Sequence, residues 1–325
     1  MGVLAPSEMA TITGLGARRD SVHVVTSPDE RPARLEVGVV GAGRVGAVLG
    51  AALQQAGHQV VAVSAVSEAS LARAADLLPG IPVLPVAEVV ARAELLVLAV
   101  PDDALEGLVV GLSATRAWQA GQLVVHTSGR HGLAVFEPAL AQHVLGLALH
   151  PAMTFTGTAM DVSRLADCCF GVTAPEPLRA VAEALVVEVG AEPVWVEEAD
   201  RPLYHAALAH GANHLVTLVA QALEALRAAG VERPHRLLGP LVGAALDNSL
   251  RAGDAALTGP VARGDVGTVA EHLRQLERLS PDIRPTYVAL ARATAERALA
   301  SGRLRPAAAE PLLDILASDN RGVQE

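Results

Sequence analysis

The amino-acid sequence predicts an α/β fold in which a mostly parallel sheet domain precedes an all-helical C-terminal domain. Two observations lead to this prediction. Short apolar runs alternate with helical patterns from residue 35 to about residue 197, as expected for a parallel sheet. From residue 200 onward, helical periodicity continues and no strand is evident. We therefore expect a flexible leader over residues 1–33, a sheet domain over 34–198, a helical domain over 199–318 and a tail over 319–325.

The first predicted strand and helix enclose a glycine-rich turn. An apolar strand over residues 35–40 runs into the sequence GAGRVG, and a helix follows over residues 44–56. In this G-x-G-x-x-G pattern the first glycine allows a tight turn, the second lets a pyrophosphate approach the backbone, and the third lets the helix pack close to the sheet. The helix N-terminus also favours an anion. The turn predicts a Rossmann-type dinucleotide site formed by Gly41, Gly43, Arg44, Val45 and Gly46.

The end of the second predicted strand, residues 58–64, indicates which dinucleotide binds. A site for NAD usually carries Asp or Glu there to hold the ribose 2′-hydroxyl. This strand instead ends at Ser64, Ser67 follows, and the first acid, Glu68, lies beyond the expected strand end. Small hydroxyls without an acid favour a 2′-phosphate. We therefore expect NADP, with Ser64, Ser67 and Arg73 as the candidate contacts.

The remaining strands of the sheet domain are predicted at residues 81–84, 94–100, 122–126, 144–149, 168–173 and 193–197, with a helix over 176–189. Because ligands bind at the carboxyl ends of parallel strands, Val100 and Pro101 are expected to line the cofactor crevice, with Thr127 and Ser128 beside it. Asp102 is expected to cap the next helix. His126 and His150 begin two polar loops at this edge. Each either contacts a ligand or caps backbone groups, and we assign His150 to the substrate.

The first long helix of the C-terminal domain, predicted over residues 202–229, carries the candidate proton donors. His210 and His214 share a face, and Asn213 lies three residues after His210, whereas His205 is directed elsewhere. We assign His205, His210 and Asn213 to catalysis and keep Tyr204 as an alternative. A histidine pair four residues apart also has zinc-site spacing, but no H-E-x-x-H or cysteine cluster accompanies it, so we expect no metal. Further helices are predicted over residues 236–252, 266–279, 285–300 and 307–317.

A second candidate region is the turn-rich segment 257–272. Thr258 and Arg263 are the candidate substrate contacts, because an arginine fork holds a carboxylate with two hydrogen bonds. Alternatively, Arg263 forms a salt bridge with Asp265 or with the other domain. Asp265 is also expected to cap the following helix.

Composition limits the class of partner. The net charge of −10 argues against nucleic acid and anionic membranes, and no uninterrupted apolar stretch of about 18 residues predicts a membrane span. Cys168 and Cys169 are adjacent and cannot staple the fold, which suits the reducing cytoplasm. The leader lacks the apolar segment of a secretory signal. The Ala- and Leu-rich helices suggest a homodimer, and the expected partner is a small-molecule substrate.

The motifs GAGRVG, LAVPDDAL, HTSG, LHPAMTF, RPLYHAALAHGANH and LTGPVARGD together resemble those of the Rossmann-like oxidoreductases that carry a C-terminal helical domain of unknown function. This family is similar to ketopantoate reductase and pyrroline-5-carboxylate reductase. The resemblance implies NADPH-dependent reduction of a small carboxylate-bearing carbonyl compound. Ketopantoate, in pantothenate biosynthesis, is the leading candidate. A cyclic imine reductase and a non-catalytic NADP-binding sensor are the alternatives.

One departure from the related hydroxyacid dehydrogenases concerns the proton donor. Those enzymes place a lysine four residues before an asparagine on the interdomain helix. If Asn213 takes the asparagine position, Ala209 takes the lysine position, and the whole chain contains no lysine. The donor would then be His205, His210, Tyr204 or a bound water.

Overall fold

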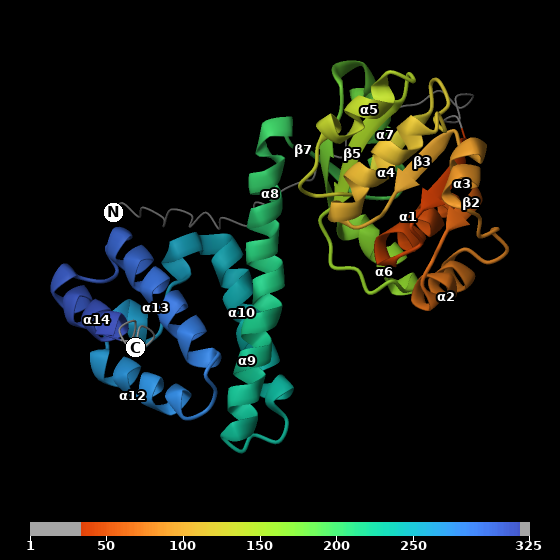
Figure 1. Ribbon diagram of the computed structural model, residues 1–325. Coiled ribbons are helices and arrows are strands. Elements are labelled where there is room, and N and C mark those ends of the chain that lie inside the picture. Colours follow the sequence, from red (N-terminus) through yellow and green to blue (C-terminus); the bar gives the residue numbers. More distant parts are fainter. Residues whose placement is uncertain (1–33, 319–325) are drawn as a thin grey trace, which may run out of the picture. The chain divides into compact units, whose positions relative to one another are not determined.

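The computed structural model describes residues 34–318, and the predicted leader and tail lie outside these residues. The chain divides into two compact units, which are treated separately below. Over the described residues, the first comprises 34–128 and 132–195, and the second comprises 129–131 and 196–318. Figure 1 shows that the first unit is a sheet covered by helices, whereas the second is built of helices.

The first unit contains a seven-stranded sheet with the strand order β2-β1-β3-β4-β5-β6-β7. All neighbouring strands run parallel except β5 and β6, which are antiparallel. The predicted α/β fold with a mostly parallel sheet is therefore confirmed. The strands are β1 (Glu36–Val40), β2 (Gln59–Ser64), β3 (Leu95–Leu98), β4 (Leu123–His126), β5 (Leu145–Pro151), β6 (Cys169–Thr173) and β7 (Glu192–Trp195).

Helices cover both faces of this sheet. One core contains residues of α1 (Arg44–Gln55), α2 (Glu68–Leu77) and α7 (Arg179–Glu188). The other contains residues of α3 (Val86–Arg92), α4 (Asp102–Ala114) and α5 (Glu137–Leu140). The short helix α6 (Ala159–Arg164) packs against α1. This arrangement leaves the carboxyl ends of β1–β5 as the sheet edge where a ligand can bind.

Two local predictions for this unit are wrong. The expected strand at residues 81–84 is reduced to a single bridge between Val63 and Val83. Proline is the reason, because Pro82 cannot donate to a ladder and Pro85 already precedes α3. Asp102 is not the N-cap residue of the next helix, because Pro101 takes that position. Asp102 instead lies in the first turn, where its charge complements the helix dipole.

The second unit contains no strand among the described residues from Val196 onward. Its helices are α8 (Arg201–Leu208), α9 (His214–Ala228), α10 (Pro234–Ala252), α11 (Pro260–Arg263), α12 (Val266–Glu277), α13 (Ile283–Ala300) and α14 (Pro306–Ser318). A π-helical turn, Ala209–Asn213, joins α8 to α9, so the predicted long helix is interrupted in its helical geometry. The hydrophobic core of the second unit includes Val261, Val269, Ala295 and Leu312.

Two further properties bear on function. Among residues 34–318, no helix is both long and apolar enough to cross a membrane. Cys168 and Cys169 are free thiols. Burial, together with the neighbouring Cys169, raises the pKa of Cys168 to about 11, so this thiol stays protonated near neutral pH and is a poor nucleophile.

Candidate functional site

The glycine turn between β1 and α1 has the geometry of a phosphate cradle. Gly41 has a φ of +93°, and a Cβ atom there would lie 2.6 Å from the Ala99 carbonyl oxygen. A Cβ atom on Gly46 would lie 2.1 Å from the Gly41 carbonyl oxygen, so only glycine fits at either position. A Cβ atom on Gly43 would meet nothing within 4 Å, so this backbone is open to a ligand. Arg44 and Val45 begin α1, whose first amides have no partner within the helix and are available to an anion.

The serine that ends β2, Ser64, and the serine that precedes α2, Ser67, are both bonded within the protein. The buried Ser64 Oγ accepts a hydrogen bond of 3.1 Å from the Gly41 amide and thereby fixes the glycine turn. Ser67 is the N-cap of α2, because its Oγ accepts from the Ser70 amide at 3.2 Å. The Ser67 hydroxyl also bonds Ser70 Oγ at 3.1 Å. Both side chains therefore fix the backbone at the end of β2 and the start of α2, and contact with the cofactor stays a prediction.

The loop after β4 is shaped by a buried histidine. His126 Nδ1 accepts from the Ser128 amide at 3.2 Å, and His126 Nε2 lies 2.9 Å from the Gly132 carbonyl oxygen. Because Nδ1 accepts, the hydrogen is on Nε2 and donates to that carbonyl. His126 therefore holds the loop that carries Thr127 and Ser128. The other predicted contacts at this edge are Val100 and Pro101, which directly follow β3, and His150, which lies on β5 opposite Gly171 of β6.

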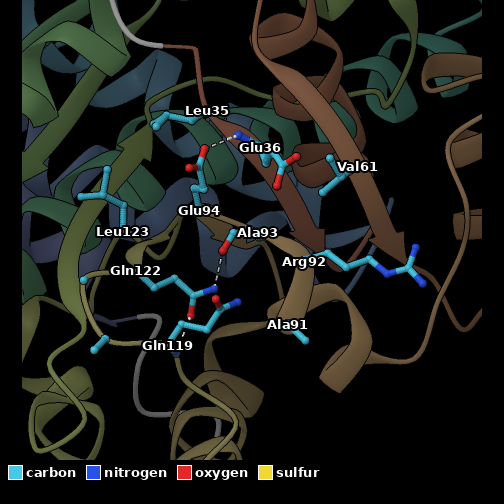
Figure 2. A pocket seen from close by; sticks show the side chains of 12 residues that line it. Leu35, Glu36, Val61, Ala91, Arg92, Ala93, Glu94, Gln119, Gln122 and Leu123 are labelled. Carbon is cyan, nitrogen blue, oxygen red and sulfur yellow. Dashed lines mark hydrogen bonds between the residues drawn. The ribbon is translucent and has the colours of Figure 1, made fainter.

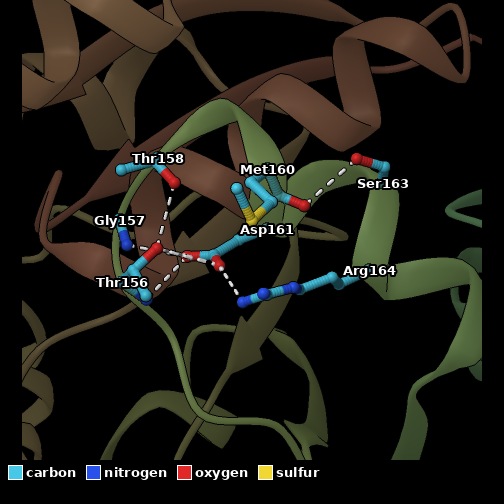
Figure 3. Close-up of polar contacts among 7 residues, drawn as sticks. All are labelled: Thr156, Gly157, Thr158, Met160, Asp161, Ser163 and Arg164. Carbon is cyan, nitrogen blue, oxygen red and sulfur yellow. Dashed lines mark hydrogen bonds and ion pairs between the residues drawn. The ribbon is translucent and has the colours of Figure 1, made fainter. Parts of the chain in front are cut away.

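A buried carboxylate organises the loop after β5 (Figure 3). The Asp161 side chain accepts hydrogen bonds from the Thr156 and Gly157 amides, both at 2.7 Å, and from the Thr156 hydroxyl at 3.0 Å. Burial raises the pKa of Asp161, but these hydrogen bonds outweigh burial and the pKa is lowered. The Asp161 carboxylate is therefore ionised near neutral pH and holds the turn rigidly.

Sequence analysis did not select Asp161 or Gly157. Their signal is weak, because a Thr-Gly-Thr turn followed by an acid is common in loops. The turn draws attention only in the folded structure, where the side chains of Arg44 and Arg73 lie against Gly157.

A cavity of about 610 Å³ lies at the opposite edge of the sheet, at the amino ends of β1, β3 and β4 (Figure 2). Its polar side chains bond the protein itself. Gln122 Nε2 donates to the Val90 and Ala93 carbonyl oxygens, and the Glu94 carboxylate accepts from the Glu36 amide. Ligands of parallel sheets bind at the carboxyl edge, so we do not assign this cavity to the cofactor.

In the helical unit, the π turn brings two histidines together. His210 Nδ1 lies 3.1 Å from His214 Nδ1, and the two rings meet edge to face. One imidazole must donate and the other accept, so the bond requires at least one neutral ring. Both line a cavity of about 470 Å³ whose other walls come from α9 and α13. Asn213 ends the π turn, and Tyr204 and His205 lie on α8 before it. Short π-helical turns of this kind often occur at functional sites.

A second cavity of this unit, about 390 Å³, is lined by Thr258 together with His272 and Tyr287. The Tyr287 hydroxyl lies 2.9 Å from His272 Nδ1, and burial raises the pKa of Tyr287. Sequence analysis missed this pair because the two residues lie on separate helices, α12 and α13.

Arg263 is the last residue of α11 and is exposed. The alternative in which it pairs with Asp265 is wrong, because no ion pair joins them. Asp265 instead caps α12 as predicted, accepting from the Thr268 amide at 3.1 Å and the Thr268 hydroxyl at 2.7 Å. These bonds, with a smaller contribution from the Arg263 charge, lower the pKa of Asp265. Within residues 34–318, the Arg263 guanidinium makes no hydrogen bond or ion pair.

Within residues 34–318, no three side chains of His, Cys, Asp or Glu gather in a way that could hold a metal ion.

Comparison with known families assigns both parts of the chain. Residues 22–151 match the model of Rossmann-like domains, and residues 168–294 match that of a domain of unknown function (DUF2520). The chain thus combines a Rossmann-like domain with a DUF2520 domain, as the resemblance of its motifs implies. No curated protein sequence matches it significantly.

Solved structures share this fold. A presumed NADP oxidoreductase from Bacteroides fragilis has a TM-score of 0.70 at 24% identity, over 81% of this chain and 98% of that one. An imine reductase from Myxococcus stipitatus in complex with NADP⁺ has a TM-score of 0.58 at 19% identity, over 82% and 95%. A pyrroline-5-carboxylate reductase from Coxiella burnetii has a TM-score of 0.50 at 16% identity, over 84% and 100%. The fold is therefore one that nicotinamide-dependent reductases use.

Proposed function

We propose that the chain is an NADPH-dependent oxidoreductase that reduces a small carboxylate-bearing carbonyl compound. The observation that carries this proposal is the β1–α1 turn, where Gly41 and Gly46 admit no side chain and Gly43 leaves the backbone open to a pyrophosphate. The shared fold of nicotinamide-dependent reductases supports the reaction class. The end of β2, which carries Ser64 and no acid, favours NADPH over NADH.

The bound cofactor would supply the hydride, and the chain's own residues would bind and protonate the substrate. Arg263 is exposed and makes no ion pair within the described residues, so it is available to a substrate carboxylate. As hydride reaches the carbonyl carbon, an electron pair moves to the oxygen, which then takes a proton. The His210–His214 pair can hold that proton on one ring, and the Asn213 amide can donate a hydrogen bond to the same oxygen. The product is a 2-hydroxy acid and NADP⁺.

Ketopantoate is the first substrate to test, because the sequence motifs resemble those of ketopantoate reductase relatives. With purified full-length protein, we expect ketopantoate to cause oxidation of NADPH, which is measured as the loss of NADPH absorbance. The His210→Gln variant should lower kcat by about 100-fold, since general acid catalysis contributes on that order. His235→Gln, an exposed histidine on α10, is the matched control and should leave kcat unchanged. Lack of turnover with ketopantoate and other 2-oxo acids would refute carbonyl reduction.

A cyclic imine is the second candidate substrate, because an imine reductase and a pyrroline-5-carboxylate reductase share the fold. A protonated imine needs no general acid to accept a hydride, so the lack of lysine in the chain matters less for this reaction. Turnover confined to cyclic imines, with little effect of His210→Gln, would select this candidate. NADPH binding without turnover of either class would leave the alternative of a non-catalytic sensor.

We further propose that the protein forms a homodimer in the cytoplasm. No residue of α9 is buried and only Pro234 of α10 is, although both helices carry many apolar side chains. Leu241 and Leu250 are 66% and 80% exposed. A second copy of the chain is the occupant that we propose for these faces, since exposed apolar surface of this extent usually marks an interface. Two free, adjacent cysteines suit a reducing compartment.

A further inference from the structure

Two arginine side chains lie against Gly157 in the loop after β5. Arg44 is the first residue of α1 and Arg73 lies in α2. A Cβ atom placed on Gly157 would lie 2.7 Å from Arg73 Nε and 3.2 Å from Arg44 Cγ, so both side chains lie against this one glycine. The three residues come from separate segments of the sequence. Together they form a basic cluster, Arg44–Arg73–Gly157, on the side of the sheet covered by α1 and α2.

Within residues 34–318, the cluster has no counterion. Among the residues that the structure describes, neither arginine forms a salt bridge or a hydrogen bond, and the acid that shapes the loop, Asp161, contacts Arg164 at 3.6 Å. Two cationic side chains that extend from one glycine, with no carboxylate paired to either, favour an anionic ligand. Arginine forks fit phosphate oxygens well.

The position of the cluster indicates which phosphate it would hold. The pyrophosphate of a dinucleotide is expected at the α1 amides and Gly43, whereas the adenosine ribose lies beyond the end of β2, where α2 begins. Arg73 projects from α2. The hydroxyls of Ser64 and Ser67 already bond the Gly41 amide and Ser70, so they are poorly placed to be the main phosphate ligands.

The loop after β5 fixes the cluster from the other side. Gly157 is buried with a φ of +82°, so a side chain there would both strain the backbone and displace Arg73. Asp161 binds the amides of Thr156 and Gly157 at 2.7 Å each and so fixes where Gly157 lies. Asp161 touches neither arginine through a hydrogen bond or ion pair and would act on them only through the loop.

We propose that Arg44 and Arg73 bind the 2′-phosphate of NADPH, and that Asp161 is a positioning residue that sets this cofactor preference through Gly157. The inference rests on the proposed function, because it assigns part of the same cofactor site. The ligand class is a ribose 2′-phosphate monoester. Gly157, against which both arginine side chains lie, belongs to the loop after β5 and not to the segment after β2.

Equilibrium binding to the full-length protein tests the proposal without relying on catalysis. Four probes are compared by calorimetry: NADPH, NADH, adenosine 2′,5′-bisphosphate and AMP. We expect the 2′-phosphorylated member of each pair to bind about 10- to 100-fold more tightly, since each charge-assisted phosphate contact contributes on that scale. Arg73→Gln should reduce this preference by about 10-fold or more without changing NADH affinity. Arg44→Gln should also reduce the preference, although Arg44 lies in the glycine turn and its loss can weaken the binding of both dinucleotides. Arg73→Lys should retain part of the preference.

Asp161→Asn should reduce the preference for 2′-phosphorylated ligands by less than Arg73→Gln does, and it should leave NADH affinity unchanged. A general loss of structure would instead weaken the binding of NADPH and NADH alike. Arg92→Gln removes the same charge from an exposed residue of α3 and is the matched control, so it should leave the preference intact. If both dinucleotides bind but the arginine variants keep the wild-type preference, or if the wild type has none, the inference is wrong. If the protein binds neither NADPH nor NADH, the proposed function itself is wrong.

Discussion

The Asp161 side chain is expected to contribute strongly to the stability of the Rossmann-like unit. The Asp161→Asn variant keeps the shape of the side chain but replaces one accepting oxygen with an NH₂ group, which would face the donors of the Thr156–Gly157 turn. Three donors bind the carboxylate, the two amides at 2.7 Å and the Thr156 hydroxyl at 3.0 Å. Losing two bonds to a charged acceptor, at about 1.5–3 kcal/mol each, should lower the free energy of unfolding by about 3–6 kcal/mol.

Tryptophan fluorescence can isolate this effect. The chain contains two tryptophans, Trp118 and Trp195, and both lie in the first unit, so urea unfolding followed by their emission reports this unit alone. Arg164→Gln is the control, since Arg164 is half-exposed and 3.6 Å from Asp161, and it should cost less than about 1 kcal/mol. If Asp161→Asn costs no more than this control, our view of Asp161 as the anchor of the turn is wrong.

Three further predictions concern Asp161, the glycine turn and the exposed face of α10. Folding lowers the pKa of Asp161, so the stability that its carboxylate contributes is complete above the unfolded-state pKa of about 3.9. This stability is lost as the pH falls through the folded-state pKa. In urea titrations, the difference in unfolding free energy between wild type and Asp161→Asn should therefore shrink below about pH 4. Gly46→Ala should abolish binding of NADPH and NADH alike in calorimetry, since its Cβ atom would lie 2.1 Å from the Gly41 carbonyl oxygen; retention of tight binding would contradict the cradle. Leu241→Glu should shift the mass measured by sedimentation from dimer to monomer, and an unchanged mass would exclude α10 from the interface.

The sequence was most informative where local chemistry decides the structure. The apolar run before Gly41 and the small-residue helix after it are sufficient to predict β1, the turn and α1, because each glycine answers a steric demand within a few residues. The same reasoning failed at residues 81–84, where apolar character predicted a strand and the missing amide of Pro82 left a single bridge. Apolar periodicity also predicted a single helix from residue 202 to 229. It could not reveal the π turn at Ala209–Asn213, because one extra residue in a turn leaves the pattern of apolar positions nearly unchanged.

Cofactor preference is the part of the site that local sequence rules describe least well. The rule for the end of β2 selected Ser64 and Ser67 because their hydroxyls follow the strand, yet the fold uses both hydroxyls to fix the backbone. The basic cluster that we assign to the 2′-phosphate depends on residues more than 80 positions apart, since Arg73 and Gly157 meet only once the β5–α6 loop lies beside α2. That meeting in turn requires a glycine with positive φ held by the buried Asp161. In our proposal, Asp161 governs which cofactor binds through the position of Gly157, and this effect depends on contacts that form only in the folded chain.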